Sequence, residues 1–424
     1  MIDIKWLRES PDEARTALAR RGAAVRPLID QALALDAKRR ELLTRVEKLK
    51  AERNAASHDV ARLKQEGKDA GHLTRSLKTL SNTIKELDQQ VRVVDQELEN
   101  VLLRIPNRPA DDLPDGDASC NRVVSSWGMP AKLGFAPKPH WELGKTLGIL
   151  DLERGAKIAG SGFPLFLGTG AKLVRAMIGF MLDLHTREHG YVEVQPPLLV
   201  NAATAQGTGQ LPDLESNMYV TEDGLYLIPT AEVSVTNLHR DEILAASELP
   251  RAYVAYTPCF RREAGAHGKD TRGLIRIHQF DKVELVRFCR PEESAAEHAK
   301  LLGHAETVLR RLEIPYRVVL LATGDLGSAS ARTYDIEVWA AGVGTWLEAS
   351  SASWFTDFQA RRANIRYRPR PDARPEFVHT LNASGVAFPR TLIALLENNQ
   401  QADGSVRIPA ALVPYFGSER LVPP

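Results

Sequence analysis

The first hundred residues carry a repeat of apolar positions that is typical of paired helices. Apolar residues recur at alternating spacings of four and three over 73–101, and a weaker run with the same spacing covers 42–63. The stronger run consists of Leu73, Leu77, Leu80, Ile84, Leu87, Val91, Val94, Leu98 and Val101. Such a stripe indicates a coiled-coil seam, and the stretch 66–72, with two glycines, indicates a turn. We therefore expect an antiparallel hairpin of two helices, each reaching roughly 50 Å.

The pattern changes near residue 105. Residues 105–140 are rich in Pro, Asp and Gly and read as a linker. Farther on, helical patterns cover 171–190, 291–312 and 390–400, and strand-like alternation of β-branched and aromatic residues covers 191–200, 225–238, 252–263, 275–288 and 334–353. Because several strands follow one another without helices between them, a mostly antiparallel sheet with helices packed on it is favoured over a doubly wound one.

The predicted fold class is therefore α+β. A long antiparallel α-helical coiled-coil hairpin occupies 1–105, a linker occupies 106–140, and an antiparallel sheet flanked by helices occupies 141–424. A chain of 424 residues is long enough for two such domains.

Net charge changes the picture only locally. The whole chain carries +1, which gives no strong field toward nucleic acid. Residues 38–68, in the first predicted hairpin helix, carry ten Lys and Arg against five Asp and Glu, a balance of +5. A basic hairpin of this kind suits a phosphate backbone, but a hairpin that only packs or dimerises fits the apolar pattern equally well.

Cysteine usage and missing motifs exclude several classes of protein. Cys120, Cys259 and Cys289 are scattered, so we expect neither a disulfide framework nor a zinc site, and a reducing cytoplasm fits. The N-terminus has no apolar signal core, and no apolar run reaches 18 residues, so no membrane span is expected. The sequence contains no P-loop motif and no complete G-x-G-x-x-G.

Three separated motifs carry the chemistry. Gly190-Tyr191, Val194 and Pro197-Leu198-Leu199 follow a helix; Phe260-Arg261-x-Glu263 precedes Arg276, Phe280 and Glu284 at spacings of four; and Arg390 opens the last long helix after a glycine-containing strand. In this order and at these distances the motifs resemble the three-motif signature of class II aminoacyl-tRNA synthetases.

A closer resemblance is to the seryl-tRNA synthetase family. It rests on "GTGQLP" (207–212), "PTAEV" (229–233), "GKDTRGLIRIHQFDKVEL" (268–285), "DFQARRANIRYR" (357–368) and "HTLN" (379–382) with Ser384, all in the family's order. The opening residues and the hairpin match too, so the resemblance covers essentially the whole chain.

This resemblance implies an ATP site. The planar fork of Arg261 would hold the α-phosphate and, beside it, the carboxylate of the amino acid. Phe280 would stack on adenine, Glu263 would accept from the adenine amino group, and Arg390 would face the γ-phosphate from its helix start. The full expected ATP-binding set is Arg261, Arg262, Glu263, Ile277, Phe280, Glu348, Ala349, Ser350, Ser351 and Arg390, of which Arg261, Glu263 and Arg390 would be catalytic.

Two further features concern the phosphates. Glu348 and Ser351 are the expected Mg²⁺ ligands, because hard oxygen donors suit a Mg²⁺ ion that bridges phosphates. No zinc is expected. A basic loop with His267, Lys269 and Arg272 would close on the phosphates or on an incoming tRNA end.

The same resemblance implies a serine pocket. Glu284, between apolar neighbours, would read the serine hydroxyl, and a site built to bond that hydroxyl rejects analogues without it. Thr230 and Glu232 would hold the α-ammonium. The expected serine-binding set is Thr230, Ala231, Glu232, Arg261, Glu284, Thr380, Asn382 and Ser384.

Some positions depart from the family pattern. Ala383 and Pro389 stand where glycine is usual, Trp354 and Phe355 stand where small or polar residues are usual, and Gly162 stands where arginine is usual. None of them is a residue expected to carry chemistry.

The implied protein is a cytoplasmic, homodimeric, Mg²⁺-dependent enzyme. It would join serine to ATP and then to tRNA(Ser), and to tRNA(Sec) where a cell has it, with the hairpin of one subunit serving the other's active site. Two rivals are a paralogue that loads serine onto a carrier protein and a non-catalytic tRNA-binding dimer. The hairpin argues against the first, and the intact set of Arg261, Glu263, Glu284, Glu348 and Arg390 against the second.

Overall fold

The computed structural model describes residues 1–130, 132–264 and 272–424. The chain forms two compact units, Ile2–Pro106 and, together with Met1, Asn107–Pro424. Each unit has its own secondary structure and its own core, and the functional site described below lies within the second.

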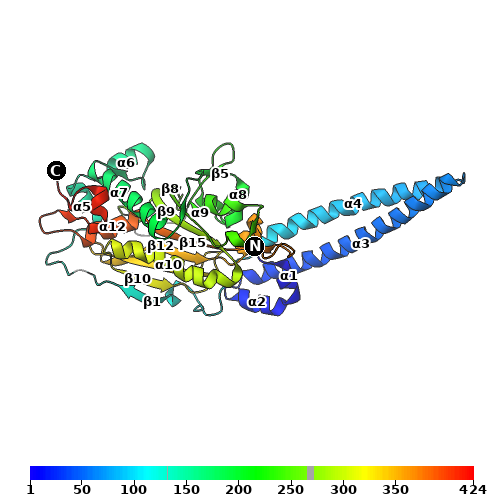
Figure 1. Ribbon diagram of the computed structural model, residues 1–424, viewed down its shortest axis with the longest axis horizontal. Helices are drawn as coiled ribbons and strands as arrows, with labels where there is room; N and C mark the ends of the chain where they lie inside the picture. Colours follow the sequence, from blue (N-terminus) through cyan, green and yellow to red (C-terminus); the bar gives the residue numbers. More distant parts are fainter. Residues whose placement is uncertain (131, 265–271) are drawn as a thin grey trace. The chain divides into compact units, whose positions relative to one another are not determined.

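The first unit is the predicted hairpin preceded by two short helices (Figure 1, blue to cyan). Its helices are α1 (Ile4–Glu9), α2 (Pro11–Ala19), α3 (Val25–Gln65) and α4 (Gly71–Leu102). Val46 of α3 packs against Leu87 and Val91 of α4, which lie on the predicted seam. Lys50 and Asp88 form an ion pair across the two helices at 3.1 Å. The prediction of an antiparallel hairpin is confirmed.

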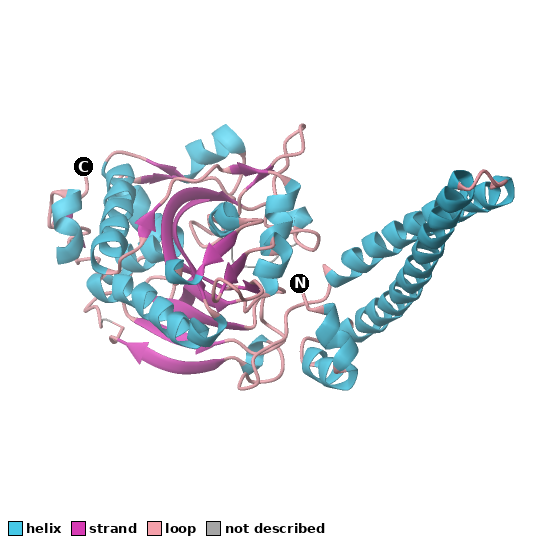
Figure 2. Cartoon of the chain, turned by 45° about the vertical axis from the view of Figure 1, so that its right-hand side comes forward, coloured by secondary structure: helices cyan, strands magenta, loops and turns pink. Residues whose placement is uncertain are grey.

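The second unit is built on an eight-stranded sheet (Figure 2, magenta) with the order β1-β10-β11-β12-β15-β9-β8-β4. Its strands are β1 (Arg122–Trp127), β4 (Val192–Glu193), β8 (Arg251–Phe260), β9 (Gln279–Cys289), β10 (Tyr316–Leu320), β11 (Arg332–Ala340), β12 (Thr345–Trp354) and β15 (His379–Ala387). Every neighbouring pair is antiparallel except β4 with β8. The predicted α+β class with an antiparallel sheet is therefore confirmed.

Helices and short strands surround this sheet. The helices are α5 (His140–Thr146), α6 (Leu152–Ala159), α7 (Thr169–Asp183, continued by a π-helical turn to Glu188), α8 (Ala202–Thr208), α9 (Glu232–Thr236), α10 (Ser294–Arg311), α11 (Phe358–Ala363), α12 (Phe388–Asn398) and α13 (Val413–Phe416). The short strands are β2 (Leu150–Asp151), β3 (Leu165–Phe166), β5 (Leu199–Val200), β6 (Tyr226–Leu227), β7 (Ile243–Ala245), β13 (Arg366–Arg368), β14 (Glu376–Phe377), β16 (Val406–Arg407) and β17 (Arg420–Leu421).

One hydrophobic core joins the sheet to its helices. Met177 of α7, Leu309 of α10 and Leu395 of α12 are fully buried together with Leu285 of β9 and Ile336 of β11. Because alternate residues of a strand face opposite sides, the strands that bury Leu285 and Ile336 present their intervening polar residues to the other side of the sheet.

The prediction of a linker over 106–140 is wrong for much of 107–127, which packs as part of the second unit. Within it, β1 pairs antiparallel with β10 at the edge of the sheet, and Leu113 is buried beside Leu320. Asn107 is buried as well, and its amide donates to the carbonyl of Phe355 at 2.8 Å. The edge strand was missed because its exposed side chains give no apolar alternation.

The predicted strand over 225–238 is also wrong beyond β6. The chain turns at Pro229 and forms α9, whose five residues are all buried. Val233, Val235 and Thr236 are β-branched and favour strands, but tertiary burial on all sides overrides that preference and leaves no helical period to read.

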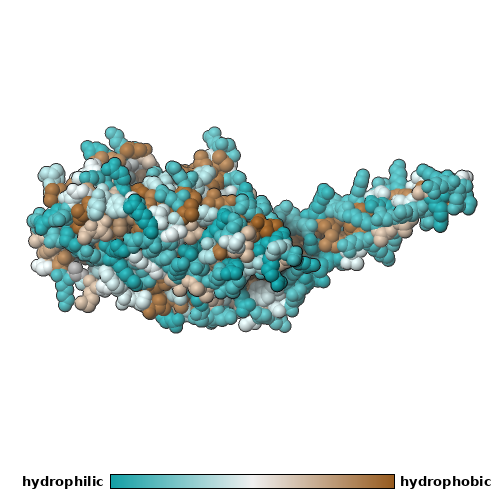
Figure 3. Space-filling model, in the orientation of Figure 1, coloured by the Kyte–Doolittle hydropathy of each residue, from teal (hydrophilic) through white to brown (hydrophobic). Residues whose placement is uncertain are grey.

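The surface is mixed in character. In the face shown in Figure 3, hydrophilic residues dominate over the hairpin, and apolar residues appear as scattered patches over the second unit. Among the residues that the structure describes, no helix combines the length and apolar character needed to cross a membrane.

Candidate active site

A cavity of about 590 Å³ opens among the sheet, helix α12 and the turn before α9. Most of the site residues predicted from the sequence line it: Thr230, Glu232, Arg261, Glu263, Ile277, Phe280, Glu348, Ala349, Ser350, Ser351, Asn382, Ser384 and Arg390. Residues from 230 to 390 thus meet in one place, although the role of each remains a prediction.

Four predicted residues do not line the cavity. Ala231 is fully buried just before α9, and Arg262 is exposed. Glu284 and Thr380 are buried. Glu284 contacts Lys282 and Asn382 of the cavity wall, and Thr380 contacts Gln359. Glu284 itself is therefore not among the residues that line the cavity, whereas its partners Lys282 and Asn382 are, and its role in reading serine stays a prediction.

The predicted basic loop is only partly described. His267 and Lys269 lie outside the described residues. Arg272 lies within them, and its guanidinium carbon is 4.5 Å from the centre of the Trp141 ring.

One end of the cavity is a buried network of charges. Lys282 donates to the Thr230 hydroxyl at 2.7 Å and lies 2.6 Å from a carboxylate oxygen of Glu284. Asn382 donates to the other oxygen of Glu284 at 2.7 Å. Lys282 and Glu284 are two residues apart on β9, so their side chains point to the same face of the sheet. Ser384 of β15 is the register partner of Glu284 and lies on that face too.

A second carboxylate adjoins the first. Glu232 accepts from Gln359 at 2.6 Å and from Asn382 at 3.0 Å, and Thr380 supports Gln359 by donating to its carbonyl oxygen at 2.7 Å. Burial and then the charge of Glu284 raise the pKa of Glu232 to about 7. Two acids, one buried ammonium and two amides suit a small ligand that brings its own ammonium and hydroxyl.

Sequence reasoning missed three side chains that contact the predicted site residues. Lys282 and Gln359 belong to the acidic network just described, and Asp335 contacts the hydroxyl of Ser351, one of the two expected metal ligands. Lys282 lies two residues before Glu284 in "DKVEL", and Gln359 lies in "DFQARR". Both therefore stand in segments that carry the family resemblance. A lysine two residues before a glutamate, in a strand pattern that continues with apolar residues, was the signal that could have identified Lys282.

The other end of the cavity holds an aromatic ring and three arginines. The guanidinium carbon of Arg261 is 5.1 Å from the centre of the Phe280 ring, a cation–π contact. Arg276 and Glu263 form an ion pair. Arg390 donates to the carbonyl of Glu348 at 2.7 Å and lies 3.3 Å from its carboxylate.

Oxygen donors that could hold a divalent cation lie beside Arg390. The Ser351 hydroxyl oxygen lies 2.6 Å from a carboxylate oxygen of Asp335 and 3.2 Å from one of Glu348. Burial and then the charge of Glu348 raise the pKa of Asp335 to about 8. Two carboxylates and a hydroxyl are hard donors that fit Mg²⁺ together with phosphate oxygens. Within the described parts of the chain, no cluster of three or more His, Cys, Asp or Glu could hold a metal by itself.

The residues that depart from the family pattern lie in different environments. Gly162 has φ +83°, and a Cβ there would lie 2.6 Å from the ring of His278, so the backbone here requires glycine. Pro389 lies in the first turn of α12 and lines the cavity. Trp354 lies outside the cavity lining and donates to His379 at 3.4 Å.

Comparison with known proteins agrees with this geometry. Residues 1–109 match the family model of the seryl-tRNA synthetase N-terminal domain, and residues 218–399 match that of the class II tRNA synthetase core domain (G, H, P, S and T). The serine–tRNA ligase of Gemmatimonas aurantiaca is 53% identical over 98% of this chain and 99% of its own, and that of Citrifermentans bemidjiense is 55% identical over 99% and 100%.

Solved structures are similar over the same extent. The seryl-tRNA synthetase from Pyrococcus horikoshii complexed with ATP has a TM-score of 0.94 and 39% identity, with both chains covered completely. These relatives match nearly their whole length, and the two family models follow each other in order. The chain therefore belongs to the seryl-tRNA synthetase family of class II aminoacyl-tRNA synthetases.

Proposed function

We propose that this chain is a serine–tRNA ligase that activates serine with ATP and transfers the seryl group to the 3′ end of tRNA(Ser), and of tRNA(Sec) where a cell has it. One observation carries the proposal. A single cavity has an acid-rich end suited to a small amino acid and an arginine-rich end suited to a nucleotide, and Arg261 lies on its wall with Thr230 and Glu232.

Serine fits the acid-rich end. Its ammonium would meet Glu232 and the hydroxyl of Thr230, and its side-chain hydroxyl would meet the group formed by Glu284, Asn382 and Lys282. Alanine and glycine would leave those buried polar atoms without a partner, which is the kind of mismatch that gives strong discrimination.

ATP fits the other end. Adenine would stack on Phe280 and donate its amino hydrogens to Glu263, and Arg261 would leave Phe280 to bind the α-phosphate and the serine carboxylate. The serine carboxylate then attacks the α-phosphorus, the bond to the bridging oxygen breaks, and pyrophosphate leaves. The protein contributes alignment and fixed positive charge, which are the main terms in such transfers.

Mg²⁺ fits the group formed by Glu348, Ser351 and Asp335. When bound, it would supply charge neutralisation between the phosphates. Arg390, now paired with Glu348, would then be available for the γ-phosphate.

The hairpin supplies the tRNA contact in this proposal. The excess of Lys and Arg along α3 suits the phosphate backbone, and the family model of the N-terminal domain covers this region. We further propose a cytoplasmic homodimer in which the hairpin of one subunit presents tRNA to the other subunit's cavity.

Two assays on the same protein test the function. Serine-dependent exchange of pyrophosphate into ATP reports the first step, and charging of tRNA(Ser) reports the second. A protein that activates serine but charges only a carrier protein would show exchange without tRNA charging, and a regulatory dimer would show neither. Both activities, with threonine and alanine giving far less exchange, are expected.

A further inference from the structure

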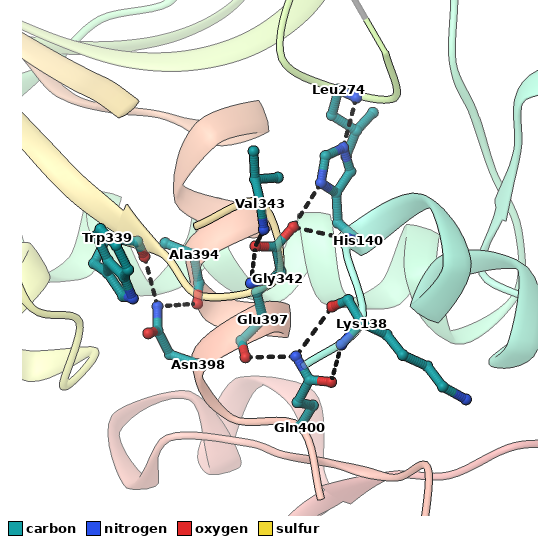
Figure 4. A network of polar contacts seen from close by, with 10 residues as sticks. All are labelled: Lys138, His140, Leu274, Trp339, Gly342, Val343, Ala394, Glu397, Asn398 and Gln400. Atoms are coloured by element: carbon teal, nitrogen blue, oxygen red, sulfur yellow. Dashed lines mark hydrogen bonds and ion pairs between the residues drawn. The ribbon is translucent and has the colours of Figure 1, made fainter. Parts of the chain in front are cut away.

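A buried histidine–glutamate pair lies outside the groups assigned to serine and ATP (Figure 4). His140 of α5 and Glu397 of α12 are both fully buried. One oxygen of Glu397 accepts from the backbone nitrogen and the Nδ1 of His140, each at 2.8 Å. The other accepts from the backbone nitrogens of Gly342 and Val343 at 2.7 and 3.0 Å. Four donors thus surround this carboxylate.

The second nitrogen of the His140 ring bonds the chain that leads into the active site. The backbone N–H of Leu274 donates to Nε2 at 2.9 Å. An accepting Nε2 carries no hydrogen, so the ring proton resides on Nδ1 and points at Glu397. The imidazole therefore joins α12 to Leu274 with one tautomer and two hydrogen bonds.

Two neighbouring contacts reinforce this junction. Gly273 has φ +67°, and a Cβ at this position would lie 2.2 Å from Nε2 of His140. Arg272 stacks over Trp141, the residue after His140. Residues 272–274 are thus fitted closely against the start of α5.

The segment that begins at Leu274 reaches the nucleotide end of the cavity at once. Ile275 and Arg276 line the cavity, the carbonyl of Ile275 accepts from Nε of Arg390 at 3.3 Å, and Arg276 pairs with Glu263. Helix α12 therefore reaches residues 274–276 at two points: directly through Arg390 at its start, and through Glu397 and His140 near its end.

We propose that His140 and Glu397 are positioning residues for ATP. By fixing Leu274–Arg276 relative to α12, they set Arg390 and the Glu263–Arg276 pair in mutual register before the nucleotide enters. The inference rests on the proposed function and deepens it. It predicts an effect on ATP and not on serine, because none of these contacts reaches Glu232, Lys282 or Glu284.

Two substitutions of His140 separate the two ends of the ring. His140→Asn can still donate to Glu397 but offers nothing to Leu274, whereas His140→Gln can accept from Leu274 but leaves Glu397 one donor short. In serine-dependent pyrophosphate exchange, His140→Asn should raise the KM for ATP by about tenfold, because a buried N–H loses its acceptor. His140→Gln should keep the KM for ATP within about threefold of the wild-type value. It should lower the melting temperature more than His140→Asn does, because the Glu397 carboxylate loses a donor.

Gly273→Ala gives an independent test, since it displaces the ring from the loop side and leaves His140 and Glu397 intact. It should also raise the KM for ATP by about tenfold with the KM for serine unchanged. His239→Asn is the matched control, because His239 is likewise buried between Glu242 (2.7 Å) and Tyr253 (2.9 Å) but away from the cavity. It should lower stability without changing the KM for ATP.

The outcomes are distinct. If His140→Asn and Gly273→Ala keep the wild-type KM for ATP, or if both KM values rise together as in a general loss of packing, the positioning role is wrong. If His140→Asn does not fold, Gly273→Ala decides alone. An unsubstituted protein that performs no serine-dependent exchange would instead overturn the proposed function.

Discussion

Two lysine–carboxylate pairs show how differently the two units use charge. Lys50 and Asp88 join the hairpin helices with side chains 44% and 40% exposed, whereas Lys282 and Glu284 meet at the wall of the cavity with 5% and 0% exposed. An exposed pair contributes at most about 1 kcal/mol. Removing one partner of a buried pair costs about 3–5 kcal/mol, because the other charge is left in a dry environment.

The difference fits the ligands proposed for each unit. The hairpin keeps its charges in water, where they could meet a large polyanion and release its counterions. The second unit pays desolvation to hold a few charges rigidly, which a small zwitterion needs if its hydroxyl is to be distinguished from a hydrogen atom. The predictions below test this contrast, beginning with the largest expected effect.

Deleting the hairpin should separate the two steps of the reaction. A chain that begins at Asn107 keeps the whole second unit except Met1, so we expect serine-dependent exchange close to that of the full chain. Charging of tRNA(Ser) should fall by about a thousandfold, because the phosphate contacts are lost. Parallel measurements on one sample decide; equal loss of both steps would mean that the hairpin is needed only for folding or dimerisation.

Breaking the buried pair should abolish serine selection. Glu284→Ala leaves Lys282 without its anion and Asn382 without an acceptor, so serine-dependent exchange should lose transition-state binding on the order of 3 kcal/mol, or about a hundredfold. Circular dichroism of the same sample controls for folding. Near-normal exchange by the folded variant would remove Glu284 from serine recognition.

Replacing the guanidinium of Arg261 by an ammonium should impair the formation of seryl-adenylate. Arg261→Lys keeps the positive charge but loses the planar pair of donors that would bridge the α-phosphate and the serine carboxylate. Exchange should fall by about thirtyfold, the value of one charge-assisted hydrogen bond. Arg262→Lys is the matched control, since Arg262 does not line the cavity; an equal loss in both variants would contradict the bidentate role.

Serine binding should depend on pH through Glu232. With its pKa raised to about 7, Glu232 holds a proton in a growing share of free molecules below pH 7. The serine ammonium favours the carboxylate form and lowers this pKa, so binding expels the proton. The KM for serine should therefore rise by up to about tenfold per pH unit below 7 and level off above it. A flat profile between pH 6 and 8 would argue against Glu232 as the ammonium partner.

Breaking the exposed pair should have the smallest effect. Asp88→Ala should lower the free energy of unfolding by less than about 1 kcal/mol, because Lys50 remains in water. Thermal unfolding of the chain measures this, with Asp59→Ala as control, since Asp59 pairs with Arg62 within one helix at 3.0 Å. A loss as large as that expected for a buried pair would erase the contrast between the units.

The same contrast explains what could be predicted from the sequence. The hairpin was predictable because its seam repeats locally, so α3 and α4 followed from spacing alone. The strands β8, β9, β11 and β12 also alternate visibly. The edge strand β1 and the buried helix α9 were missed. All of β1 except Trp127 is exposed and all of α9 is buried, so neither leaves a periodic apolar pattern.

The order of the motifs predicted most of the residues that meet at the cavity. It could not show which of them line the cavity and which are buried beside it. That Glu284 contacts Asn382 depends on the pairing of β9 with β15, whose partner residues are about a hundred positions apart. Likewise, Gln359 and Asp335 become functional candidates only because the fold places them against Glu232 and Ser351.

The contact of Arg261 with Phe280 has a consequence for how the site distinguishes ATP from its fragments. Arg261 covers the ring on which adenine would stack, so adenosine alone would have to displace a cation and offer it no anion in return. Inorganic pyrophosphate alone could attract Arg261 away but would leave the ring bare. Only a molecule that carries base and phosphates together makes both exchanges at once. Fragments of ATP should therefore bind less tightly than their separate contacts imply, so the contact between Arg261 and Phe280 would itself discriminate against them.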